Sequence, residues 1–110
     1  MIKIFRASSR LCVNRILFAN PATQIPGRWG RTTLTLRMSY DEGQTWPVAR
    51  VLHPGFSAYS SLVVLQDGSI GCLFESGGDV KKERYQHITF ARFPLAWLTQ
   101  GQDLQGLHMK

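Results

Sequence analysis

A strict alternation of apolar and polar side chains between residues 33 and 39 constrains this chain most. In the stretch TLTLRMS, the residues Leu34, Leu36 and Met38 recur at every second position, and Thr or Arg stands between them. Successive side chains of an extended strand point to opposite faces, so a period of two predicts a half-buried β-strand. A helix would require a period near 3.6, which is not present here.

Similar short runs predict that most of the chain is extended. Residues that favour tight bends separate the runs, at positions 41–43, 54–55, 66–68 and 76–79. The expected strands are residues 15–19, 33–39, 47–52, 59–65, 70–75 and 86–93, with a weaker one at 2–5, and residues 95–99 predict a short helical turn. The predicted fold class is therefore all-β.

The strands are expected to form antiparallel meanders that divide near His53-Pro54-Gly55. Each half then has the length of one four-stranded propeller blade, roughly 40 to 50 residues. Two blades leave sheet edges uncovered, because radial repetition protects the edges only in a complete ring. The sequence therefore predicts about two blades of an incomplete β-propeller, with a two-sheet sandwich as the alternative.

Composition excludes several classes of function. Of the 110 residues, 44% are hydrophobic and 18% are charged, which is typical of a globular domain. The formal charge of +6 favours anionic ligands, but the basic residues are scattered without an RNA-binding signature, so nucleic acid is not an expected partner. Cys12 and Cys72 form no CxxC motif, and the histidines stand far apart, so no metal site is expected. Both cysteines are expected to be reduced thiols, and no cofactor is expected.

No signal peptide or membrane-spanning run is visible in this chain, and no compartment is assigned.

The most specific short motif is SYDEGQTW, residues 39–46. Asp41 can accept hydrogen bonds from amides of its own turn, Gly43 can adopt positive φ, and Trp46 can pack back across the hairpin. With Ser39, the motif resembles the Asp box, or bacterial neuraminidase repeat, of sialidases and several other propeller proteins. A catalytic role for Asp41 is the alternative, but turn chemistry accounts for each residue, so the motif bears on fold more than on activity.

Longer stretches extend the resemblance to the exo-α-sialidase family. They are RILFANPA (15–22), GRTTLTLRMSYDEGQTWP (30–47), AYSSLVVLQDGSIGCLFE (58–75) and HITFARF (87–93), and they look like the last two blades of that six-bladed propeller in order and separation. The resemblance implies a penultimate blade with the Asp box at residues 1–53, a last blade at 54–100 and a tail at 101–110. It also implies retaining hydrolysis of terminal sialic acid from sialylated glycoconjugates.

Tyr59 stands in SAYSSL, at the head of an apolar run. A sialoside carries a carboxylate on its anomeric carbon, which would repel an Asp or Glu nucleophile, whereas a phenol deprotonated only as it attacks avoids that repulsion. Sialidases use a tyrosine nucleophile, and the resemblance implies this role for Tyr59. In the family a glutamate on an earlier blade deprotonates it, and nothing in this chain aligns with that glutamate. The alternative is a strand-end aromatic with its hydroxyl at the surface.

Arg31, in GRTTL, matches the third of three arginines that hold the sialic acid carboxylate in the family. A guanidinium suits this task because it donates two parallel hydrogen bonds to a carboxylate. Arg28 and Arg37 compete for the assignment, and an ordinary surface arginine is the alternative.

Glu75 matches a glutamate that, in the family, orients the first of those arginines. A two-residue turn at Asp67-Gly68 would place Glu75 opposite Ser60, and one more loop residue would place it opposite Tyr59. A base for Tyr59 and a solvated carboxylate are the alternative roles.

The resemblance also implies that two arginines, an aspartate acid/base and the glutamate base would precede residue 1. The chain is therefore expected to be a C-terminal portion, incomplete or inactive alone, with missing blades or self-association needed to cover its sheet edges. Two other hypotheses stay open. One is a non-catalytic Asp-box protein that binds glycans or acts as a scaffold, and the other is an unrelated basic β-domain that binds RNA.

Overall fold

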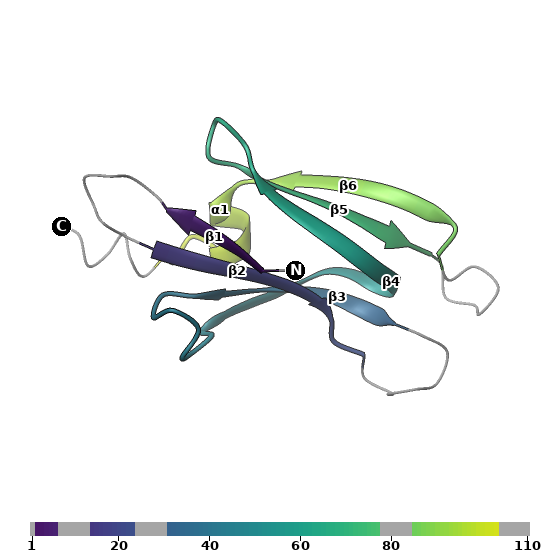
Figure 1. The fold of residues 1–110 in the computed structure, drawn as a ribbon, viewed down its shortest axis with the longest axis horizontal. Coiled ribbons are helices and arrows are strands. Elements are labelled where there is room, and N and C mark those ends of the chain that lie inside the picture. The colour runs from purple at the N-terminus through teal and green to yellow at the C-terminus, as the bar shows by residue number, and fades with distance from the viewer. Residues whose placement is uncertain (1, 7–13, 24–30, 78–84, 104–110) are drawn as a thin grey trace.

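The computed structural model describes residues 2–6, 14–23, 31–77 and 85–103 (Figure 1). Its elements are β1 (Ile2–Arg6), β2 (Asn14–Pro21), β3 (Thr32–Ser39), β4 (Val48–Val64), β5 (Ile70–Ser76), β6 (His87–Phe93) and α1 (Leu95–Thr99). The described part is all-β apart from α1, as predicted, and the helical turn at 95–99 is confirmed. Cys12, Arg28 and residues 104–110 of the predicted tail lie outside the described residues.

The six strands follow one another in the sheet in chain order, and every neighbouring pair is antiparallel. β4 pairs with two strands: its residues up to Phe56 pair with β3, and those from Ser57 onward pair with β5. The meander therefore bends into two layers (Figure 1). The first layer holds β1 to β3 with the start of β4, and the second holds the end of β4 with β5 and β6. Within the described residues the sheet stays open.

The strand break predicted at Pro54-Gly55 is wrong, because β4 runs without interruption for 17 residues. Pro has no backbone N–H to donate to a ladder, which is why it usually ends or avoids an interior strand position. Here the pairing with β3 jumps from His53 to Phe56, so Pro54 has no partner in that register. Pro54 therefore stands at an irregular position of the β3–β4 ladder, where no backbone N–H is needed, and β4 continues past it.

The core lies between the two layers. Leu34, Leu36 and Met38 are at most 2% exposed, which confirms that the apolar side of the alternating stretch is buried. Buried residues of the second layer and of α1 complete the same cluster: Leu62, Ile70, Cys72, Phe74, Phe93 and Leu98. Burial of this apolar surface is the main force that holds the layers together.

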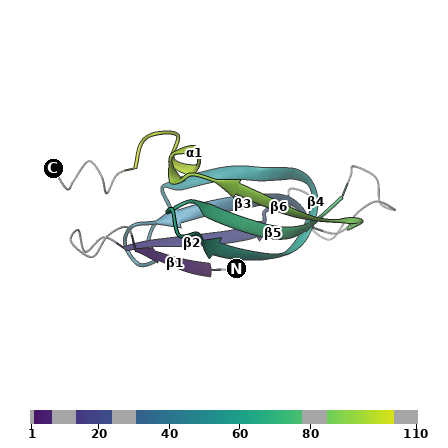
Figure 2. The same cartoon turned by 90° about the horizontal axis from the view of Figure 1, so that it is seen from above.

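Helix α1 lies at one end of the molecule, close to the start of β4 (Figures 1 and 2). The guanidinium of Arg50 lies 4.2 Å from the Trp97 ring centroid and also donates to the Trp97 carbonyl. The Trp97 ring in turn lies 5.0 Å from that of Phe93 on β6. These contacts fix α1 against both layers. Among the described residues, no helix has the length and apolar character needed to cross a membrane.

Candidate functional site

Tyr59 lies on a bulge of β4. The ladder with β5 pairs Ser60 with Phe74 on one side and Ser57 with Ser76 on the other. Two residues of β4, Ala58 and Tyr59, therefore stand against the single residue Glu75. A bulge of this kind re-aims the side chains that it carries. Ala58 is 2% exposed, whereas Tyr59 is 73% exposed, so the bulge directs the phenol outward.

This register settles where Glu75 lies. Because Ser60 pairs with Phe74, the predicted alternative that placed Glu75 opposite Ser60 is wrong, and Glu75 faces the bulge that carries Tyr59. A hollow of about 220 Å³ is lined by residues of β4, β5 and β6, among them Tyr59, Glu75, Leu73 and Ile88. Glu75 thus lies on the strand beside Tyr59, and its role, as a base or as a residue that orients an arginine, stays a prediction.

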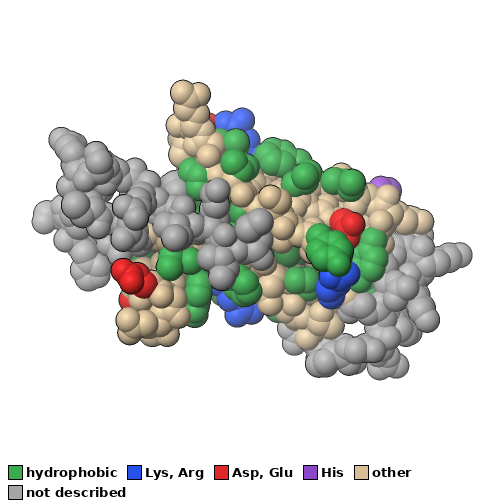
Figure 3. Space-filling view, in the orientation of Figure 1, with side chains coloured by type: hydrophobic (Ala, Val, Ile, Leu, Met, Phe, Trp, Pro, Cys, Tyr) green, Lys and Arg blue, Asp and Glu red, His purple; other side chains and the backbone are tan. Residues whose placement is uncertain are grey.

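Arg31 stands beside Tyr59. Its guanidinium carbon lies 4.8 Å from the Tyr59 ring centroid, within the range of a cation–π contact. The Arg31 carbonyl accepts a hydrogen bond of 2.8 Å from the backbone N–H of Ser57, which ties the residue before β3 to the bulge on β4. Figure 3 shows basic, acidic and apolar side chains side by side toward one end of the face on view.

Of the competing arginines, only Arg37 lies among the described residues. It sits two residues before the end of β3, where it pairs with Ala49 of β4 and Phe18 of β2. Six residues of extended chain, about 20 Å, separate Arg37 from Arg31. Arg37 is therefore not at the end of the sheet that holds Tyr59.

Tyr85 is a member of this cluster that the sequence did not indicate. Its phenol oxygen accepts a hydrogen bond of 2.9 Å from the backbone N–H of Arg31, and its ring centroid lies 5.6 Å from the Arg31 guanidinium carbon. A hydrogen bond with Tyr85 is the largest cause that raises the pKa of the Arg31 guanidinium; desolvation lowers it by less, and a hydrogen bond with Tyr59 adds a further, still smaller increase. Tyr85 precedes β6, whose first residue pairs with Ser76, so only the β5–β6 register brings it here.

The predicted Asp-box motif, residues 39–46, lies at the opposite end of β3. The eight residues of that strand span about 26 Å, so Asp41 is remote from Tyr59. The Asp41 carboxylate accepts hydrogen bonds from the Thr45 hydroxyl at 2.6 Å and the Thr45 N–H at 2.8 Å. These bonds, with one from the Ser39 hydroxyl, lower the pKa of Asp41 to about 2. All of these hydrogen bonds to the Asp41 carboxylate come from residues of its own turn, which is the structural role that the sequence predicted.

The other residues of the box complete the same turn. The hydroxyl oxygen of Ser39 accepts a hydrogen bond of 2.8 Å from the Gly43 N–H. Gly43 has a φ of 89°, which a residue with a side chain rarely adopts. Trp46 packs within 6.0 Å of the Phe18 ring on β2, measured between ring centroids.

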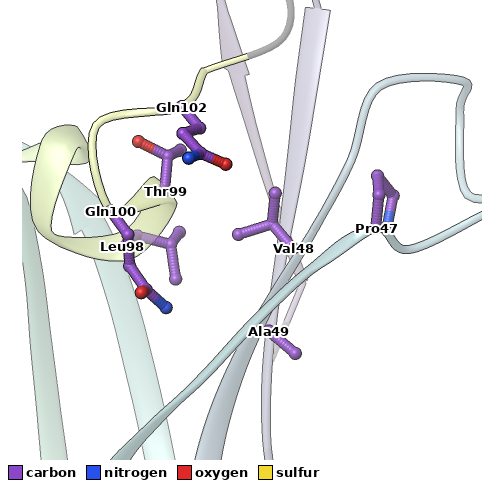
Figure 4. A pocket seen from close by; sticks show the side chains of 7 residues that line it. All are labelled: Pro47, Val48, Ala49, Leu98, Thr99, Gln100 and Gln102. Carbon is purple, nitrogen blue, oxygen red and sulfur yellow. The ribbon is translucent and has the colours of Figure 1, made fainter.

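A second hollow, of about 300 Å³, lies between the start of β4 and helix α1 (Figure 4). Its lining is uncharged: Pro47, Val48, Ala49, Leu98, Thr99, Gln100 and Gln102. The Thr99 hydroxyl already donates to the Leu95 carbonyl at 3.2 Å. This hollow offers no charged group to a ligand. Nor do three or more His, Cys, Asp or Glu side chains gather as a metal site anywhere in the described ranges.

A curated sialidase from Micromonospora viridifaciens is 43% identical to this chain over 83 residues. The match covers 76% of this chain and 11% of the sialidase, so the chain spans about a tenth of that protein's length. No protein-family model matches the chain.

Proposed function

This chain is related to the sialidase family, and on that premise we propose that it supplies the nucleophile and one carboxylate-binding arginine of a retaining exo-α-sialidase. The observation that carries the proposal is the approach of Arg31 to Tyr59, with 4.8 Å from guanidinium carbon to ring centroid. Both side chains are exposed at the same end of the sheet. A cation that binds the substrate carboxylate there would hold the anomeric carbon near the phenol.

The chemistry of a sialoside suits this pair. Its carboxylate is attached to the anomeric carbon, so two parallel hydrogen bonds from Arg31 would fix that carbon in place. The Tyr59 oxygen then bonds to the anomeric carbon while its proton passes to a carboxylate base, and a carboxylic acid protonates the departing glycosidic oxygen. Water next displaces the tyrosine oxygen, which regains a proton, and two inversions give net retention.

In this proposal the acid, the base and two further arginines come from sequence outside these 110 residues. We assign Glu75 to the orientation of one of those arginines, because it faces the bulge beside Tyr59. The Asp box keeps a structural role, since Asp41 is about 26 Å from the site along β3 and its oxygens serve the turn.

The two layers are proposed to be adjacent blades of an incomplete propeller, with residues 1–53 in one, 54–100 in the other and 101–110 as a tail. The outward face of the second layer supports this arrangement. Val63, Leu73, Phe90 and Ile88 are 40 to 74% exposed there. An apolar sheet face of this kind is typical of a surface that packs on another sheet, which further blades or a second copy would provide.

The first test measures binding of N-acetylneuraminic acid to the chain by NMR titration. Arg31→Ala should weaken binding about 10- to 100-fold, because charge-assisted hydrogen bonds to the carboxylate are lost. Arg92→Ala is the matched control, since Arg92 is an exposed arginine that pairs with Asp67 on the same layer. Equal weakening by both substitutions would mean that general charge, and not a site at Arg31, attracts the ligand.

The second test measures hydrolysis of a fluorogenic sialoside when the chain is joined to sequence that carries the acid and the base. Tyr59→Phe should abolish turnover, whereas Tyr40→Phe should retain it. The wild-type product should first appear as the α-anomer. An unchanged rate for Tyr59→Phe would refute the assignment of the nucleophile. Sialoside binding through Arg31 without turnover in any assembly would instead indicate the glycan-binding alternative.

A further inference from the structure

We propose that Tyr85 is a positioning residue that holds Arg31 against Tyr59. This inference rests on the proposed function for its consequence in substrate binding, but the contact itself is a property of the free chain. Tyr85 does not belong to the stretches through which the sequence indicated a site. It reaches the cluster from the segment before β6.

Tyr85 contacts Arg31 at two places. Its phenol oxygen accepts the Arg31 backbone N–H at 2.9 Å, and its ring lies 5.6 Å from the guanidinium carbon. Because the Tyr59 ring lies 4.8 Å from the same carbon, the guanidinium has an aromatic neighbour in each of two tyrosines. A cation beside two ring faces is attracted to both. Tyr85 therefore constrains the main chain and the side chain of one arginine together.

Tyr85 is itself braced by the bulged strand. Its ring meets the Phe56 ring edge to face, with centroids 6.3 Å apart and planes at 76°. Phe56 is 4% exposed, and its carbonyl accepts the Gly77 N–H at 2.9 Å, directly after β5. The next residue on β4, Ser57, donates to the Arg31 carbonyl at 2.8 Å. Both backbone groups of Arg31 are thus engaged: Tyr85 accepts from its N–H, and Ser57, next to the Tyr59 bulge, donates to its carbonyl.

The backbone beside Arg31 gives a separate reason for such a brace. Thr33, two residues further along, has a φ of 62°, a left-handed conformation that is unfavourable for a β-branched residue. The ladder between β3 and β4 shifts register on both sides of Leu34. Conformations of this kind persist only where surrounding contacts enforce them. The hydrogen bond from Arg31 to Tyr85 is one such contact, at the start of the strained segment.

Positioning matters because an exposed arginine has many rotamers, and a ligand must restrict them before it gains both hydrogen bonds. If Tyr85 restricts Arg31 beforehand, less entropy is lost on binding. Removal of the phenol oxygen should therefore weaken carboxylate binding although Tyr85 does not touch the carboxylate itself.

The experiment compares Tyr85→Phe with Tyr40→Phe in the full chain. Each substitution removes one phenol hydroxyl that makes a hydrogen bond. The Tyr40 hydroxyl donates to the Asp103 carboxylate at 2.8 Å, at the other end of β3. In the free chain, Tyr85→Phe should speed hydrogen exchange of the Arg31 amide on the order of tenfold, because that amide loses its acceptor. Tyr40→Phe should leave Arg31 exchange unchanged. Equal exchange in all three proteins would overturn the proposal.

A binding measurement then tests the consequence. Tyr85→Phe should weaken N-acetylneuraminic acid binding roughly five- to tenfold, and combined with Arg31→Ala it should cause no further loss, because both act through one group. Additive losses would overturn the positioning role. Failure of the wild-type chain to bind the sugar would count against the proposed function alone, since the exchange experiment still decides whether Tyr85 holds Arg31.

If Tyr85→Phe does not fold, Phe56→Leu is the second variant. It removes the ring that packs against Tyr85 and should speed exchange of the Arg31 amide by a smaller factor.

Discussion

Replacement of Ser39 by Ala should destabilise the chain through the hairpin between β3 and β4. The Ser39 side chain is fully buried, and its oxygen accepts hydrogen bonds from the Gly43 N–H at 2.8 Å and the Asp41 N–H at 3.2 Å. Alanine leaves both amides without that acceptor. The Ser39 hydroxyl also donates to the Asp41 carboxylate at 2.7 Å, so three hydrogen bonds are lost. At about 1 kcal/mol each, the expected loss in the free energy of unfolding is about 3 kcal/mol.

A loss of this size is large against the total stability of a small domain, which is on the order of 5–15 kcal/mol. It should lower Tm by about 15 °C. Urea denaturation followed by tryptophan fluorescence measures the change. Trp46 reports on the hairpin because its ring lies over Gly43, where an added Cβ would be 3.6 Å from the ring. The slope of the unfolding transition should stay unchanged, since Ser→Ala barely alters the area of surface that unfolding exposes.

Ser61→Ala is the matched control, because Ser61 is an exposed serine on β4. Its free energy of unfolding should stay within about 0.5 kcal/mol of the wild type. A Ser39→Ala protein as stable as this control would refute the claim that the Asp box clips the hairpin. Sialic acid binding by the folded Ser39→Ala protein should be retained, and its loss would argue for a role of the box in the site.

Further predictions concern packing and ionisation. Gly71→Ala should cost about 1–3 kcal/mol of unfolding free energy in urea titrations, because the new Cβ would lie 2.6 Å from the Phe90 ring and 2.9 Å from Val63; a neutral effect would show that both side chains move aside freely. The pKa of Asp41 is lowered to about 2, below its ordinary 3.8, so its contribution is present above about pH 4 and is lost as pH falls through about 2. Acid titration of stability should therefore be flatter in Asp41→Asn, and identical curves would contradict this. Burial raises the pKa of Cys72 to about 11, so its thiol should resist alkylation at pH 8 until the chain unfolds, and rapid labelling of Cys72 in the folded chain would contradict its burial.

The pairing of strands in the tertiary structure determined how most side chains of the candidate site are placed. The sequence placed Tyr59 and Arg31 by resemblance, but the bulge that turns Tyr59 outward depends on the register of β4 against β5. Tyr85 could not be identified in advance, because its approach to Arg31 requires two strand registers and spans 54 positions of chain. Sequence patterns report local preferences, whereas these contacts join segments whose separation only the pairing determines.

Local chemistry explains what the sequence by itself determined. The alternation of Leu34, Leu36 and Met38 fixed a buried strand face, and the turn residues at 41–43 and 66–68 fixed where two of the hairpins bend, because each depends on neighbours within a few residues. The continuity of β4 through Pro54, in contrast, depended on the tertiary structure. Proline's missing donor normally ends a strand, and only the irregular ladder with β3 made that donor unnecessary. Whether a local preference is expressed or overridden depends on the hydrogen-bond partner that the tertiary fold presents.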